Sequence, residues 1–138
     1  MRRFRSETSA PVPEGWFTKD SITLLSPDGQ ANVIASSEPL DPSIDTARYA
    51  EVQGELLTKE FPGYVEHEYR QVEVFGGREG YLRAFEWRPP DGEPVTQLQI
   101  YHASEGRGFT ATATTPSAHF AEKEFLLRQI MDDLMIET

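Results

Sequence analysis

The stretch VTQLQIY, residues 95–101, alternates polar and apolar side chains. Successive side chains of a β-strand point to opposite faces, so Gln97 and Gln99 share one face while Leu98 and Ile100 share the other. One polar and one apolar face is typical of an antiparallel strand that covers a core on one side only. Two successive amides on one face therefore indicate either a solvated surface or a surface that meets a partner.

Further β-type segments surround this strand and are separated by turn residues such as Pro27-Asp28-Gly29 and Gly76-Gly77. The short connections favour antiparallel pairing, because parallel neighbours need crossovers of about a dozen residues or more. We expect strands in seven places, at about residues 2–7, 21–26, 31–36, 64–75, 80–87, 94–104 and 108–115.

Two segments change from a period of 2 to one of about 3.6 residues, which predicts helices from Asp45 to Phe61 and from Ser117 to Ile136. Asp45 or Thr46 is the candidate N-cap of the first helix, and Pro62-Gly63 ends it. One side of this helix is predicted to carry Tyr49, Val52, Gln53, Leu56 and Glu60. The order of elements predicts one α+β domain, residues 1–138, with a twisted, mainly antiparallel sheet of about six or seven strands and two principal helices.

The composition of the chain excludes some kinds of chemistry and disfavours some classes of binding partner. The chain has no cysteine, which removes thiolate catalysis and disulfides, and its net charge of −10 disfavours binding to nucleic acid or anionic lipid. No stretch approaches the roughly 20 apolar residues of a spanning helix. The basic opening MRRFRSE is followed by TSAPVPEGW, which contains no apolar run of signal length. We therefore expect a cytoplasmic protein that does not insert into the membrane.

No motif predicts catalysis. His67, His102 and His119 lie on different predicted elements and have no metal-ligand spacing, and no serine lies in a G-x-S-x-G elbow. The sequence GRGFTA, residues 106–111, has a degenerate dinucleotide pattern, but the alternation that follows it is typical of a strand and not of the required helix. We expect no enzyme, no catalytic residue, no metal and no cofactor.

Several polar side chains are predicted to face inward or into a concavity. They are Gln53, Gln97 or Gln99, Asn32 and Ser36. Burying an amide without a partner costs roughly 1–3 kcal/mol, so these groups need partners either within the chain or on a ligand.

Several short motifs, taken in order, resemble a known family. They are W-x-x-x-x-S-I-x-x from Trp16 to Leu24, VIAS in the second strand of the hairpin, Y-A-E-V-Q from Tyr49 to Gln53, F-P-G-Y from Phe61 to Tyr64, and LQIY. Their order and spacing resemble the Eag effector-associated chaperones of type VI secretion, which share a PsbP-like fold with DcrB-like proteins. The resemblance implies a cytoplasmic homodimer that wraps the N-terminal hydrophobic segments of membrane-inserting effectors.

The same resemblance implies a client-binding groove, with Gln97 as a bystander or helper. Its residues would be Ile22, Leu24, Asn32, Ser36, Gln53 and Gln99, of which Asn32 departs from the serine expected there. Aliphatic side chains would replace water over the client helix, and the amides would give direction to binding. Alternative functions are a DcrB-like or PsbP-like protein-binding module or assembly factor of another pathway, and an immunity protein against a secreted toxin.

Overall fold

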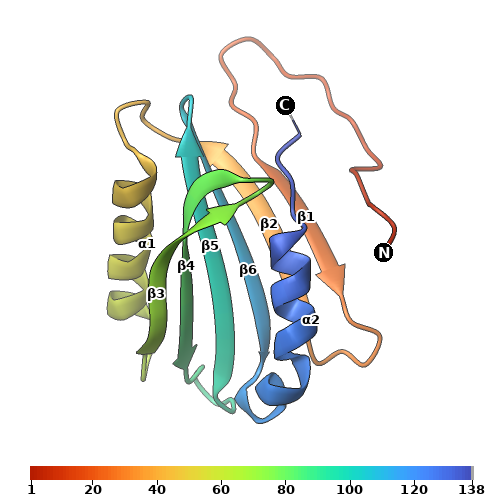
Figure 1. Ribbon diagram of the computed structural model, residues 1–138. Helices are drawn as coiled ribbons and strands as arrows, with labels where there is room; N and C mark the ends of the chain where they lie inside the picture. The colour runs from red at the N-terminus through yellow and green to blue at the C-terminus, as the bar shows by residue number, and fades with distance from the viewer. Residues whose placement is uncertain (138) are drawn as a thin grey trace.

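A six-stranded sheet dominates the computed structural model, which describes residues 1–137 (Figure 1). Its strands are β1 (Asp20–Leu25), β2 (Asn32–Pro39), β3 (Val65–Val74), β4 (Arg78–Trp87), β5 (Val95–Ser104) and β6 (Arg107–Pro116). The helices are α1 (Thr46–Glu60) and α2 (Phe120–Asp132), and a short 3₁₀ turn, η1 (Ser117–His119), precedes α2. The strand order is β1-β2-β6-β5-β4-β3 with antiparallel neighbours throughout, which confirms the predicted α+β fold.

The predicted start and end of α1 are confirmed to within one residue. The side chain of Asp45 accepts a hydrogen bond from the backbone N–H of Arg48 at 2.8 Å, as an N-cap does. Phe61 ends the helix, directly before Pro62. The side of α1 that packs on the sheet differs from the prediction at its end, because Leu57 is buried whereas Leu56 is exposed.

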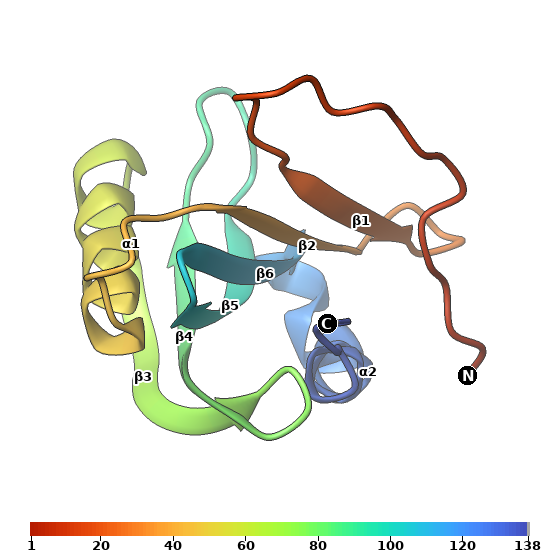
Figure 2. The ribbon, with the colours of Figure 1, turned by 90° about the horizontal axis from the view of Figure 1, so that it is seen from above.

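The two helices lie on opposite sides of the sheet (Figure 2). On the α1 side, a small cluster forms around Tyr49, Ala50, Tyr101 and Ala103. The larger core lies on the α2 side. It includes Val33, Leu82, Leu98, Ile100, Ala111, Ala113, Leu127 and Met131. Because β5 alternates, its apolar residues Leu98 and Ile100 enter the larger core and its glutamines face the other side.

The predicted strand at residues 2–7 is wrong, because residues 1–19 form no helix or strand. This segment runs beside the C-terminal residues instead of a sheet edge (Figure 1). Arg3 donates to the backbone oxygen of Asp133 at 2.9 Å, and Arg5 pairs with Glu137 at 3.4 Å. Charged side chains that reach sideways to a neighbouring segment do not supply the apolar face that a strand needs.

The second helix is shorter than predicted at both ends. Residues 117–119 form the 3₁₀ turn, and α2 ends at Asp132 instead of Ile136. Acidic side chains at a helix C-terminus oppose the helix dipole, which disfavours continuing through Asp132 and Asp133. Leu134 and Ile136 still pack against the larger core, so their apolar pattern reflects burial without helix.

Candidate functional site

The α1 side of the sheet is only partly covered. The helix packs on β4 and β5, and among residues 1–137 no helix lies over β1 and β2 on this side (Figure 2). Exposure alternates accordingly, since Ile34 is 41% exposed while its neighbour Val33, on the other face, is buried. We call the uncovered surface the open face; its residues are Thr23, Leu25, Asn32, Ile34, Ser36, Gln97, Gln99, Thr112 and Thr114.

Two rows of side chains cross the open face from strand to strand. The first row is Thr23, Ile34, Thr112 and Gln99, and the second is Leu25, Asn32, Thr114 and Gln97. Directly opposite residues in an antiparallel pair have Cβ atoms about 4.5–5.5 Å apart, so each row is continuous. Threonines stand in the middle of both rows, and apolar Ile34 and Leu25 stand toward the β1 edge. Small central side chains leave space for another backbone to approach closely.

Both glutamines have partners within the chain. Gln97 accepts from the indole Nε1 of Trp87 and donates to Thr114, each at 2.8 Å. Gln99 accepts from the Tyr101 hydroxyl and donates to Thr112 at 3.1 Å. A primary amide has two lone pairs and two N–H groups, so each glutamine retains one of each. The amides are thus fixed by the sheet and still able to bind a partner.

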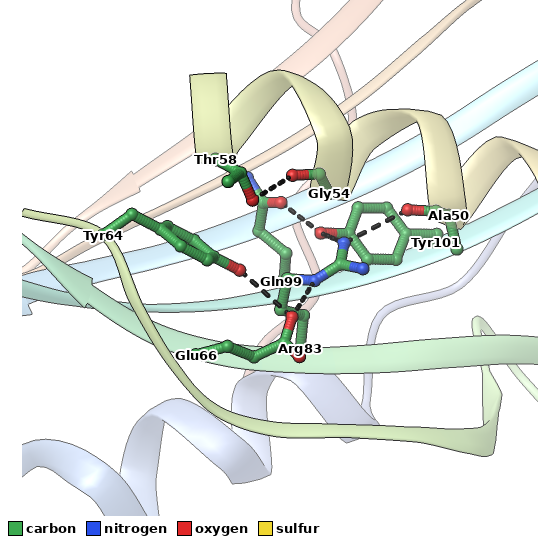
Figure 3. Close-up of polar contacts among 8 residues, drawn as sticks. All are labelled: Ala50, Gly54, Thr58, Tyr64, Glu66, Arg83, Gln99 and Tyr101. Atoms are coloured by element: carbon green, nitrogen blue, oxygen red, sulfur yellow. Dashed lines mark hydrogen bonds and ion pairs between the residues drawn. The ribbon is translucent and has the colours of Figure 1, made fainter. Parts of the chain in front are cut away.

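A buried arginine lies beneath α1 next to this face (Figure 3). Arg83 on β4 is 3% exposed; its Nη1 donates to the backbone oxygen of Ala50 at 3.1 Å and to the Tyr101 hydroxyl at 2.8 Å. Its Nε donates to Glu66 on β3 at 2.9 Å, and the guanidinium lies 4.1 Å from the centre of the Tyr69 ring. One side chain thereby connects α1 with β3, β4 and β5.

Burial keeps the tyrosines of this network in their neutral form. It raises the pKa of Tyr101 well above its usual range, although Arg83 opposes this rise. Burial, followed by the charge of Glu66, raises the pKa of Tyr64 to about 12. Tyr101 therefore retains its hydroxyl hydrogen at neutral pH and can donate it to Gln99.

The six predicted groove residues are divided between the two faces of the sheet. Asn32, Ser36 and Gln99 lie on the open face. Gln53 is half-buried on the side of α1 that packs against the sheet, and residues 1–137 give its amide no hydrogen-bond partner.

Ile22 and Leu24 face the α2 side, because they pair with Ala35 and Val33 and not with the residues of the open face. Ile22 lines a hollow of about 380 Å³, and Leu24 lines another of about 440 Å³. Ser36 also lines the first of these hollows and Asn32 the second, so the structure separates Ile22 and Leu24 from Gln53 and Gln99 and not from all four other residues. The residues of β1 that lie on the open face are Thr23 and Leu25.

Sequence reasoning missed three central residues of the open face, which are Ile34, Thr112 and Thr114. The alternation FTATATT predicts a strand with threonines on one face and alanines on the other. That pattern does not say which face lacks a helix. Arg83 belongs to no motif of the sequence, and its buried hydrogen bonds were not predicted.

Comparison with known proteins places the chain in a family. The family model for DcrB matches residues 7–133. The chain belongs to the DcrB family. Among curated proteins, none matches its sequence.

Solved structures with the same fold come from diverse bacteria. PA94 of Pseudomonas aeruginosa, a protein of unknown function, has a TM-score of 0.77 at 19% identity, over 98% of this DcrB-family chain and 96% of its own. LpqN of Mycobacterium tuberculosis, involved in cell envelope biogenesis, has a TM-score of 0.59 at 16% identity, over 90% and 87%. PsbP of Synechocystis sp. PCC 6803 has a TM-score of 0.58 at 7% identity, over 91% and 96%. At such identities the likeness shows the fold alone, and it confirms the predicted PsbP-like fold.

Residues 1–137 lack two kinds of feature. No helix there combines the length and apolar character needed to cross a membrane. Nor do these residues hold a group of three histidine or acidic side chains placed to bind a metal ion.

Proposed function

We propose that this DcrB-family protein is a cytoplasmic chaperone that binds an N-terminal hydrophobic helix of a type VI secretion effector on the open face. The single observation that carries the proposal is a sheet face beside α1 that no helix of residues 1–137 covers and that still holds hydrogen-bonded amides. The short motifs that resemble Eag chaperones supply the class of client. The proposal includes no catalytic residue and no cofactor, because holding a helix needs no covalent step.

The residues of the open face suit an apolar helix with small side chains. Ile34 and Leu25 offer exposed apolar surface, and each Å² removed from water contributes about 25 cal/mol. Thr112, Thr114 and Ser36 are small enough to let a client backbone come close, as small residues do between membrane helices. The spare groups of Gln97 and Gln99 can then meet polar atoms of the client.

The strongly acidic surface supports a role away from lipid. A net charge of −10 repels anionic membranes, so a helix held on this protein would be kept from inserting early.

The chaperone is proposed to act as a homodimer that pairs through β1, at one edge of the sheet. The opposite edge, β3, carries Glu66, Glu68 and Arg70, and charged side chains discourage edge pairing. Residues 21–25 of β1 carry no charge. We expect light scattering to give the mass of two chains at tens of micromolar, and a single-chain mass with and without client would contradict the dimer.

A substitution on the open face tests the chaperone role. Ile34→Asp places a charge against the client helix, and we expect its affinity to fall at least about thirtyfold, which corresponds to about 2 kcal/mol. Val65→Asp is the matched control, because Val65 is a β-branched strand residue of similar exposure, 50% against 41%, on the other face. Its affinity should stay within about twofold of the wild type.

The measurement is co-expression with tagged N-terminal hydrophobic segments of type VI effectors, followed by fluorescence anisotropy with the segment that co-purifies. Melting temperatures of both variants should stay close to that of the wild type. Equal loss of affinity in the two variants, or none in Ile34→Asp, would remove the open face as the client site.

A second candidate function uses the same surface. Hydroxyl and amide groups outnumber apolar side chains on the open face, which suits a folded, polar partner of an assembly pathway other than secretion. Such a protein should bind none of the hydrophobic segments, and its binding to the folded partner should still weaken in Ile34→Asp.

A further inference from the structure

We infer that Thr112 and Thr114 of β6 donate hydrogen bonds from the open face, so that the client binds through oxygen atoms that accept them. This inference rests on the proposed function and names the chemistry of the contact. It follows from the direction of two hydrogen-bond chains that cross the sheet from β4 to β6.

The first chain begins at Arg83, whose guanidinium can only donate. Its Nη1 donates to the oxygen of Tyr101, so the hydroxyl hydrogen of Tyr101 is left for Gln99 Oε1 (Figure 3). That bond fixes the orientation of the Gln99 amide, because the oxygen must face Tyr101. The Gln99 nitrogen therefore faces Thr112 and donates to its Oγ1 at 3.1 Å.

The second chain begins at Trp87, whose indole N–H can likewise only donate. It donates to Gln97 Oε1 at 2.8 Å, which turns the amide nitrogen of Gln97 toward Thr114. That nitrogen donates to Thr114 Oγ1 at 2.8 Å. Both chains thus run in the same direction, and their orientation follows from obligate donors.

Each chain ends on a hydroxyl whose hydrogen is unused. Within residues 1–137 no acceptor takes the hydroxyl hydrogen of Thr112 or Thr114. The two residues are separated by one residue on the same strand, so their Cα atoms lie about 7 Å apart on one face. Both are partly exposed, so the hydrogens can reach a partner.

The ligand class that fits two parallel donors is a pair of carbonyl oxygens on the client backbone. The last four carbonyl groups of a helix have no partner within it, and carbonyl oxygens elsewhere in a helix keep a second lone pair. Glycine or alanine at the contact would let the client backbone come within hydrogen-bond distance.

The test replaces each hydroxyl by a methyl group of similar shape. With the co-purifying effector segment as the probe, Thr112→Val and Thr114→Val should each weaken binding about threefold to tenfold, and the double variant more than either. Thr112→Ser keeps the donor and should bind within about twofold of the wild type. Thr110→Val is the control on the same strand and face, since the Thr110 hydroxyl is paired with Tyr49 beneath α1 at 2.8 Å.

The outcomes separate this inference from the function on which it rests. If the double variant binds as tightly as the wild type while Ile34→Asp does not bind, the donor role is overturned and the chaperone role stands. An equal loss in Thr110→Val would assign the effect to general disturbance of β6 and also overturn the donor role. If no effector segment binds the wild-type protein, both proposals fail together.

Discussion

Replacing Phe85 by alanine should lower the free energy of unfolding by about 3–5 kcal/mol, the range seen when a buried aromatic ring is removed. The Phe85 side chain has no exposed surface. The centre of its ring lies 5.3 Å from the ring centre of Tyr64 and 6.4 Å from that of Phe61. Phe61 directly follows α1 and Tyr64 directly precedes β3, so the ring joins both elements to β4. Urea denaturation followed by circular dichroism measures the change.

The matched control for this prediction is Phe125→Ala, which removes the same atoms from a side chain that is 82% exposed on α2. We expect its free energy of unfolding to stay within about 0.5 kcal/mol of the wild type, as at most surface positions. A loss of similar size in both variants would show that the Phe125 side chain is buried in solution and not exposed on α2.

Much of the fold could be predicted because local signals agree with it. The turn at residues 27–29 and the alternation on either side determine the first hairpin, and Asp45 with Pro62 brackets α1. These signals act over a few residues, so they can be recognised in a single sequence. The N-terminal segment lacked such agreement, since its charged side chains allowed a strand but supplied no apolar face.

The candidate site was less predictable, because it depends on which face of the sheet a helix leaves uncovered. Shifting a strand assignment by one residue moves every side chain to the opposite face. Ile22 and Leu24, which the resemblance to Eag chaperones implied as groove residues, lie on the α2 side, whereas Thr23 and Leu25 lie on the open face. Sequence alone gives the alternation of β1 and its pairing in the first hairpin, but not which of its two faces α2 covers.

The network around Arg83 could not be derived from local pattern at all. Its partners are Ala50, Glu66 and Tyr101, which come from three different elements. A buried arginine has no periodic signature, and its presence among aromatic residues was equally consistent with a solvated charge at the end of a long side chain. A glycine in the middle of α1, at position 54, is a sign in the sequence of this close packing, because glycine is a costly residue within a helix.

The second large effect concerns Arg83 and Gly54 together. Arg83→Met should lower the free energy of unfolding by about 3 kcal/mol, near the lower end of the range for breaking a buried ion pair, because Glu66 is partly exposed and regains water. A Cβ atom at Gly54 would lie only 2.7 Å from Cζ and 3.1 Å from Nη1 of Arg83. The arginine cannot withdraw without losing its bonds to Ala50 and Tyr101.

The effect of Gly54→Ala on the free energy of unfolding should therefore change sign when the residue at position 83 is changed. In the wild type, overpacking against Arg83 costs about 1–3 kcal/mol and outweighs the gain of about 1 kcal/mol in helix propensity, so the protein should be destabilised. In the Arg83→Met background the flexible methionine can yield, and Gly54→Ala should stabilise the protein by up to about 1 kcal/mol. We expect urea denaturation of the wild type, the two single variants and the double variant to give a coupling energy of about 2 kcal/mol. Additive effects would mean that Arg83 does not hold α1 against the sheet.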